Sequence, residues 1–226
     1  MPILEICRKR LRNGLLPTDP ALKSAFAEVR KSTGADIAFY SAIEEPEAFF
    51  VLAMWPSMEV FDAFVASPDS AAVLAPIDRI STEEWMEFIS LDKLETLPLD
   101  APVMTVSRCF FKEYEDHPQR YFKEVSALVG PIEEETKPWR YIGDWTVDST
   151  PEKHKWMVFG GWRSKRHHQE FATQLKKTCD FFEGIPEHYN EGTVHRHCWN
   201  MEKDPEEGIF EVLDGFVPQK ISKAAP

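Results

Sequence analysis

The chain has 226 residues with 43% hydrophobic and 12% aromatic content, which is enough for a packed core in one large domain or two small ones. Its formal net charge of −12 argues against nucleic acid or an anionic membrane as a partner, because phosphate groups would be repelled. No run approaches the roughly 18 apolar residues of a membrane span, and the charged start does not resemble a signal peptide.

The four cysteines are scattered and form no CxxC pair: Cys7, Cys109, Cys179 and Cys198. A zinc site or a disulfide framework is therefore not expected. Reduced thiols in a cytoplasmic protein are the expectation.

Residues 1–92 predict the order β-α-β-β-α-β. Alternating apolar positions predict strands, and apolar positions three and four apart predict helices. Strand patterns cover 3–11, 37–43, 49–55 and 84–91, and helix patterns cover 21–32 and 57–66. This order is that of a ferredoxin-like unit.

The same order returns after a proline-bearing linker at 93–102. Strand patterns cover 103–111, 139–147, 155–162 and 194–201, and helix patterns cover 118–129 and 164–182. We call residues 1–92 the first half and residues 103–202 the second half. Residues 203–226 form an acidic, then lysine- and proline-bearing tail.

A short unit occurs once in each half. Trp55 and Trp162 each end an apolar strand, a Ser follows two residues later, and Phe64 or Phe171 follows nine residues later. The Ser is expected to cap a helix that turns the Phe inward. An internal duplication is therefore predicted. Since each half alone would leave one sheet face bare, the fold class is α+β, with two tandem ferredoxin-like halves forming one intramolecular barrel.

These features resemble the dimeric α+β barrel superfamily, in particular its antibiotic-biosynthesis-monooxygenase-like branch. The resemblance covers about residues 1–202 and rests on the two Trp-x-Ser turns, the two Phe residues and the aromatic or His-rich last strands. The first half is similar to tandem members from filamentous fungi. The resemblance implies a small-molecule pocket between the sheet and the helices of a half. Known members include cofactor-independent oxygenases of aromatic polyketides, polyketide cyclases, lactone isomerases, haem-degrading oxygenases and stress proteins.

The haem-degrading members imply an Asn on the first strand, an aromatic residue on the second helix and an axial His about ten residues later. The matching positions are Cys7, Phe64 and Leu74 in the first half and Ser107, Phe171 and Phe181 in the second. The axial His is missing from both, and no nucleotide or flavin motif is present. No cofactor is therefore expected.

Glu5 is the candidate general base of the first half. It shares a strand face with Ile3 and Cys7. If helices cover that face, desolvation would raise the pKa of the carboxyl and suit it to accept a proton. The alternative is that this face points elsewhere, or that Glu5 pairs with an arginine.

Four histidines distinguish the second half. His167 and His168 flank the helix face of Phe171, and His195 and His197 share one face of the last strand. We align them with Val60, Phe61, Trp85 and Glu87 of the first half. One or two imidazoles, above all His168, His197 and His195, are candidate acid/base groups. They would also make a workable metal set, but no carboxylate completes a ligand motif, so no metal is expected. Surface or core histidines are the alternative.

A set of mostly aromatic side chains is expected to line the pockets and bind a flat ligand. It comprises Tyr40, Trp55, Phe64, Tyr141, Asp144, Trp162 and Phe171. The alternative is that these rings are ordinary core residues.

The resulting prediction is a cofactor-independent monooxygenase, cyclase or isomerase acting on a small hydrophobic, aromatic polyketide-type metabolite, with the second half as the reactive one. The alternative is a non-catalytic ligand-binding or stress-responsive barrel. The expected assembly is a monomer with an internal pseudo-dimer, or a homodimer of it.

Overall fold

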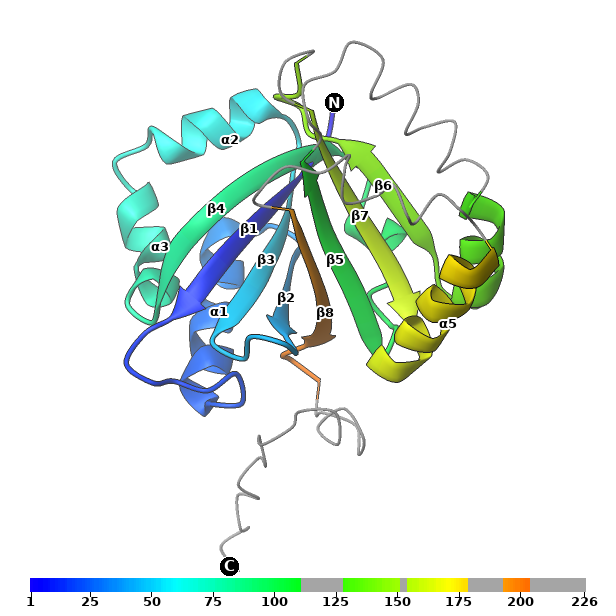
Figure 1. Ribbon diagram of the computed structural model, residues 1–226. Coiled ribbons are helices and arrows are strands. Elements are labelled where there is room, and N and C mark those ends of the chain that lie inside the picture. Colours follow the sequence, from blue (N-terminus) through cyan, green and yellow to red (C-terminus); the bar gives the residue numbers. More distant parts are fainter. Residues whose placement is uncertain (111–127, 151–153, 179–192, 204–226) are drawn as a thin grey trace, which may run out of the picture.

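A single eight-stranded antiparallel sheet forms the centre of the molecule (Figure 1). The structure is a computed structural model, which describes residues 1–110, 128–150, 154–178 and 193–203. The strands are β1 (Ile3–Leu11), β2 (Ile37–Ala42), β3 (Ala48–Trp55), β4 (Ser81–Ser90), β5 (Val103–Phe110), β6 (Tyr141–Trp145), β7 (Lys155–Trp162) and β8 (Val194–Asn200). Their spatial order is β4-β1-β3-β2-β8-β5-β7-β6.

The sheet is strongly curled, and its two edge strands meet at one end (Figure 1). There, Ile89 of β4 bridges Thr146 just after β6, and the amide of Val147 donates to the carbonyl of Phe88 at 2.8 Å. In the middle of the sheet β2 pairs with β8, so strands from the two predicted halves form one continuous sheet. Each set of four strands follows the same relative order, which is compatible with a duplication. The division into halves remains a prediction.

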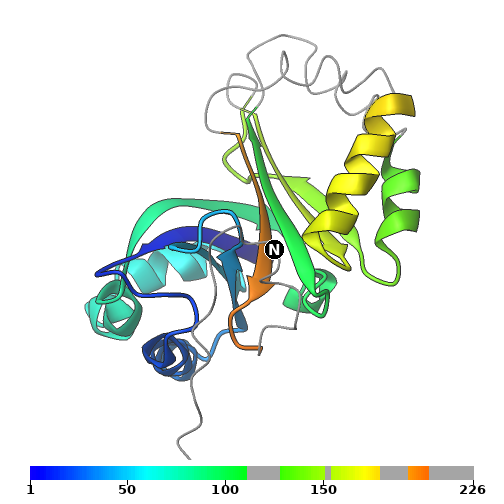
Figure 2. The same cartoon turned by 60° about the horizontal axis from the view of Figure 1, so that its bottom comes forward.

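The helices lie on the outer face of the sheet, and the opposite, concave face is the inner face (Figure 2). They are α1 (Pro20–Thr33), α2 (Met58–Val65), α3 (Ser70–Asp78) and α5 (Lys165–Thr178), together with helical residues 128–136. The 3₁₀ turn η1 (Leu94–Thr96) lies on the inner side instead, where Leu94 is buried. No single described helix has the length and apolarity to span a bilayer. The bent pair α2 and α3 meets that test only jointly, across an 87° bend.

The serines before α2 and α5 cap these helices as the sequence predicts. The Ser57 hydroxyl accepts from the amide of Val60 at 3.4 Å, and the Ser164 hydroxyl accepts from the amide of His167 at 3.1 Å. The serine of each Trp-x-Ser unit therefore satisfies an amide in the first turn of the next helix, which confirms its predicted role.

The helix predicted for 118–129 falls mostly outside the described residues. Residues 128–136 are helical, so the prediction that Gly130 and Pro131 end a helix is wrong. A proline lacks an amide hydrogen and clashes with the preceding turn, but it ends a helix only where that turn cannot adjust. The same holds for Pro76, which lies within α3.

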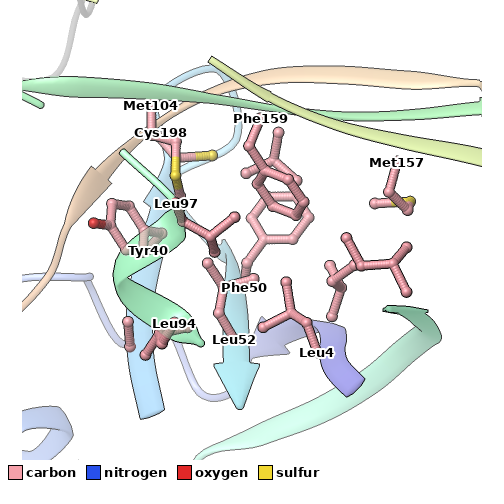
Figure 3. Packing of buried hydrophobic residues seen from close by; sticks show 14 of the residues in the cluster. Leu4, Tyr40, Phe50, Leu52, Leu94, Leu97, Met104, Met157, Phe159 and Cys198 are labelled. Atoms are coloured by element: carbon pink, nitrogen blue, oxygen red, sulfur yellow. The ribbon is translucent and has the colours of Figure 1, made fainter. Parts of the chain in front are cut away.

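The inner face encloses the largest apolar cluster (Figure 3). Leu4, Phe50 and Phe159 point into it from different strands of the curled sheet. The segment predicted as a linker also contributes, because Leu94 and Leu97 are buried in the same cluster. Residues 93–102 are thus partly core rather than a simple tether.

Buried ion pairs cross the inner face next to this cluster. Glu87 of β4 is 2% exposed and contacts both Arg108 of β5 and Lys155 of β7. The Arg108 Nε donates to Glu87 at 2.8 Å, and its guanidinium lies 4.4 Å from the ring centre of Trp85. These contacts link β4 to strands at the other end of the sheet, where no backbone ladder joins them.

A second group of charges lies on the same face. Glu45, in the turn after β2, contacts both Arg8 of β1 and Arg196 of β8. Burial opposes ionisation of Glu45, but hydrogen bonds from Arg196 and the charge of Arg8 lower its pKa. The turn after β2 is thereby held against both β1 and β8.

Candidate functional site

The two faces of the sheet separate the predicted site residues. Tyr40 belongs to the inner cluster, where its hydroxyl donates to the carbonyl of Leu99 at 2.9 Å. Asp144 pairs with Met157, another inner-face residue, and accepts from the amide of Trp145. Neither therefore lies with the other predicted ligand-binding residues on the outer face. These two residues were assigned wrongly because the alternation of side chains along a strand divides them between two faces. It does not say which face the helices cover.

In the first half, Glu5 and Trp55 form a buried pair on the outer face. The indole Nε1 of Trp55 donates to Glu5 Oε2 at 2.7 Å. The Trp55 ring contacts Phe61 and Phe64 at centroid distances of 5.4 and 5.1 Å, and Phe61 contacts Phe88 at 4.7 Å. Within the described part of the chain, Glu5 makes no ion pair with an arginine.

The pKa of Glu5 is raised from 4.5 to about 7. Burial is the main cause, and the hydrogen bond from Trp55 and the charge of Lys9 oppose it only in part. The thiol of Cys7, on the same strand face, is fully buried and its pKa is also raised by burial, so it lacks the thiolate character of a nucleophile. Glu5 is thus the group in this region whose proton affinity suits acid/base work near neutral pH.

The raised pKa of Glu5 predicts a pH-dependent stability. The folded protein binds this proton more tightly than the unfolded chain, so the Glu5 contribution is fully present below about pH 4.5 and is lost as pH rises through about 7. Glu5→Gln keeps an oxygen for the Trp55 indole and cannot ionise. At pH 4.5 the free energy of unfolding of Glu5→Gln is expected to equal that of the wild type. At pH 8 it is expected to be about 3 kcal/mol larger than that of the wild type.

Urea denaturation at the two pH values measures this difference. Glu28→Gln on the exposed face of α1 is the control. Its free energy of unfolding should differ from that of the wild type by the same amount at both pH values. Parallel pH profiles for Glu5→Gln and the wild type would contradict the prediction.

Two histidines of the second half and one carboxylate of the first form a hydrogen-bonded chain on the outer face. His168 Nδ1 lies 2.8 Å from His197 Nε2, and His197 Nδ1 lies 2.6 Å from Glu44 Oε1. The His168 ring packs on Trp162 at a centroid distance of 4.2 Å, and Phe171 contacts the same indole at 5.6 Å. The structure thus brings together five of the predicted site residues of this half, counting His195 on the same strand face as His197. We call His168, His195, His197 and Glu44 the histidine cluster.

The pKa values within the histidine cluster move in opposite directions. Burial, together with His197 and the other nearby histidines, lowers the pKa of His168 to about 3, so its ring is neutral at physiological pH. Burial opposes ionisation of Glu44, but hydrogen bonds from His197 and Lys165 and the charge of His197 lower its pKa to about 2. The pKa of His195 is lowered by desolvation of its ring and by Arg196, although part of the residue reaches the surface.

The two Trp-x-Ser units have matching surroundings. The Trp162 indole donates to Thr105 Oγ1 at 3.1 Å, as the Trp55 indole donates to Glu5, the third residue of the equivalent strand. Gly160 makes room for this bond, because a Cβ there would lie 3.0 Å from both Thr105 Oγ1 and Trp162 Nε1. Tyr141 pairs with Gly160 in the ladder and lies beside it, so it belongs to this outer-face group.

The strand register corrects the alignment of the last strands. Glu5 is opposite Phe88 in one ladder, and Thr105 is opposite His197 in the other, so His197 corresponds to Phe88 rather than to Glu87. By the same ladders His195 corresponds to Met86 rather than to Trp85. A one-residue slip exchanges the two faces of a strand, and sequence spacing across loops of different length cannot exclude it.

Glu44 is the site residue that sequence reasoning missed. It lies in the turn after β2, at 28% side-chain exposure, and 153 residues separate it from His197. The available signal was a pair of acidic residues, Glu44 and Glu45, in a turn between two buried strands. That signal did not indicate the histidines as partners, because the β2–β8 pairing is a tertiary feature.

The described residues contain no group of three or more His, Cys, Asp or Glu side chains arranged to hold a metal ion. His168 Nδ1 and His197 Nε2 are hydrogen-bonded to each other. The cluster therefore contains a hydrogen-bonded chain of two imidazoles and one carboxylate.

Comparison with known proteins identifies the fold. No family model matches the chain, and no curated protein matches it. Among solved structures, a candidate monooxygenase from Fusobacterium nucleatum matches with a TM-score of 0.57 at 12% identity, over 88% of this chain and 92% of that one. An anthrone oxidase-like protein matches with a TM-score of 0.57 at 11% identity, over 88% and 91%.

A haem-binding protein from Thermus thermophilus also matches, with a TM-score of 0.50 at 10% identity over 88% of this chain and 90% of that one. These likenesses show that the chain has the α+β barrel-like fold of monooxygenase-like proteins. At such identities they show the fold alone, because one fold hosts many activities.

The haem site implied by the family resemblance does not fit the residues present. Leu74 on α3 stands at the axial position of the first half and has no nitrogen to bind iron. Phe64 packs on Trp55 and Phe171 on Trp162. Phe181, at the axial position of the second half, lies outside the described residues and is no iron ligand by its chemistry.

Proposed function

We propose that the chain is a cofactor-independent enzyme that removes a proton from a small hydrophobic, aromatic polyketide-type metabolite. The observation that carries this proposal is a difference between the halves. Phe61 and Phe88 pack edge to face in the first half, and the equivalent positions in the second half hold His168 and His197 in a hydrogen bond. Polar groups removed from water cost about 1–3 kcal/mol when unsatisfied, and the hydrogen bond between the rings avoids that cost. A satisfied pair of imidazoles where the first half has two phenyl rings supports a chemical role.

The chemistry begins with transfer of an activated C–H or phenolic O–H proton to the histidine pair. In a monooxygenase, the resulting carbanion transfers electrons to O₂, and the adduct takes up a proton to give a hydroperoxide. In a cyclase or isomerase, the carbanion attacks a carbonyl or is reprotonated elsewhere, without oxygen uptake. All three reactions need the same base, held in water-poor surroundings.

The substrate class follows from the side chains around the base. Phe171 and Tyr141 are half-buried aromatic side chains on the same face as His168, and aromatic ligands stack on such rings. Trp162, at 1% exposure, supports the ring of His168 from beneath. The fold likeness to a candidate monooxygenase and to an anthrone oxidase-like protein supports the same class.

We also propose that residues 1–92 and 103–202 arose by duplication, as in tandem fungal members of the resembled branch, and that the second half became the reactive one. The support is the repeated strand order, the two serine caps and the two matched indole hydrogen bonds. The protein would then act in the cytoplasm as an internal pseudo-dimer, alone or as a homodimer.

The decisive experiment uses an anthrone as the probe. The purified protein, without added cofactor, is expected to bind the anthrone, detected by quenching of tryptophan fluorescence, and to convert it with or without oxygen uptake. Binding without conversion would support the alternative, a non-catalytic ligand-binding barrel. Absence of both would contradict the substrate class.

The purified protein is also expected to be colourless, with neither a Soret band nor a flavin band, because the residues do not fit the implied haem site and dinucleotide motifs are missing. Absorbance spectroscopy of freshly purified protein measures this. A stoichiometric haem or flavin spectrum would contradict cofactor independence.

A further inference from the structure

Glu44 is held firmly at the end of the histidine chain. Its Oε1 lies 2.6 Å from His197 Nδ1, and its Oε2 accepts from the His197 amide at 3.0 Å. Lys165 Nζ lies 3.1 Å from the same Oε1, and the amide of Ile43 donates to the His197 carbonyl at 2.7 Å. Both carboxylate oxygens are therefore fixed relative to the His197 ring.

This arrangement determines where the ring hydrogens lie when both rings are neutral. An ionised carboxylate only accepts hydrogen bonds, so His197 must carry its hydrogen on Nδ1. The Nε2 atom of a neutral His197 is then an acceptor, and His168 must donate to it from Nδ1. The hydrogen of neutral His168 is thus committed to Nδ1, and its Nε2 keeps a lone pair. Within the described residues, Nε2 has no hydrogen-bond partner.

We propose that Glu44 is a positioning residue that sets both histidine tautomers and makes His168 Nε2 the atom that accepts the substrate proton, an inference that rests on the proposed function. The substrate C–H or O–H bond breaks and an N–H bond forms at His168 Nε2. The Nδ1–H bond of His168 then breaks as an N–H bond forms at His197 Nε2. The positive charge ends on His197, in contact with the Glu44 carboxylate.

The surroundings favour this final location of the charge. The His168 ring is packed against Trp162, and its neighbours include His167 and His195. His197, by contrast, contacts an anion directly. The two imidazoles therefore act as one base, in which His168 receives the proton and His197 holds the charge.

The relay also depends on both predicted halves. Glu44 comes from the turn after β2, whereas His168 and His197 come from α5 and β8. In the first half the equivalent positions hold Phe61 and Phe88, whose rings have no N–H group that a carboxylate could accept from.

Nitrogen NMR of the ¹⁵N-histidine-labelled protein near neutral pH tests the proposal without any substrate. His168 and His197 are expected to show a protonated Nδ1 and an unprotonated Nε2. Glu44→Ala is expected to release His197 towards the Nε2–H form that free histidine prefers, and so to reverse the His168 tautomer. Glu44→Asp keeps a carboxylate and should keep the Nδ1–H form predominant. Glu47→Gln, in the same turn but paired with Arg10, is the control with unchanged tautomers.

An Nε2–H form of His168 in the wild type would overturn the proposal, as would unchanged tautomers in Glu44→Ala. With an active substrate, Glu44→Ala should also lower turnover by up to about 10⁴-fold, the cost of a catalytic histidine in the wrong tautomer. If the tautomers respond as expected while no substrate is ever converted, the positioning by Glu44 stands and the proposed function fails.

Discussion

Replacing His168 with Phe is expected to lower turnover by about 10²–10⁴-fold, the usual cost of removing a general acid/base group. Phe is the residue that the first half has at the equivalent position, as Phe61, so the ring shape and the packing on the neighbouring indole are retained. Steady-state kinetics with the anthrone probe measures the loss. The affinity for the probe should change little, because the stacking surfaces remain.

Two further variants sharpen this result. His167→Gln alters a neighbouring imidazole that pairs with Glu135 instead of His197, and it should turn over at close to the wild-type rate. The double variant His168→Phe, His197→Phe recreates the Phe61–Phe88 pair and should stay folded but inactive. If Glu5→Gln abolishes turnover while His168→Phe is fully active, the reactive half is the first and not the second.

Replacing Glu87 with Gln is expected to destabilise the fold by about 3–5 kcal/mol, because Arg108 would lose its buried counter-charge and Lys155 would keep only the exposed carboxylate of Asp148. For a chain of this size, that loss corresponds to a fall in Tm of roughly 6–20 °C. Urea denaturation followed by tryptophan fluorescence measures the change.

The control for this effect is Glu47→Gln, whose carboxylate is 52% exposed and pairs only with Arg10 in the described residues, and it should cost less than about 1 kcal/mol. In the double variant Glu87→Gln, Arg108→Met, the buried charge that lost its partner is removed as well. It should recover part of the lost stability. A Glu87→Gln variant as stable as the control would show that the ion pairs contribute nothing to holding β4 against β5 and β7.

The local elements were predictable because the forces behind them are local. Alternating apolar residues along Ile3–Leu11 and helical spacing along Pro20–Thr33 depend only on near neighbours. The same holds for Ser57 and Ser164, whose hydroxyls cap helices that start at the next residue. Gly130 and Pro131 show the limit of such reasoning, since local breakers can be accommodated within a helix.

The faces and the register were decided by contacts between distant segments. Tyr40 and Asp144 looked like ligand-binding residues in the sequence, and the curl of the sheet placed them on the inner face. Trp85 and Glu87 looked like counterparts of His195 and His197, and the β1–β4 ladder turned them inward instead. A strand pattern of period two has two equivalent solutions, and only packing selects one.

The sequence by itself determined that four imidazoles gather on one helix and one strand of the second half, whereas residues 1–92 contain no histidine. Only the tertiary structure decided which partners two of them have, because Glu44 reaches His197 through the pairing of β2 with β8. Hydrogen bonds form over about 3 Å, whereas the sequence separates these residues by 153 positions. The partner of a titratable group, and with it the protonation of that group, is therefore a property of the folded chain.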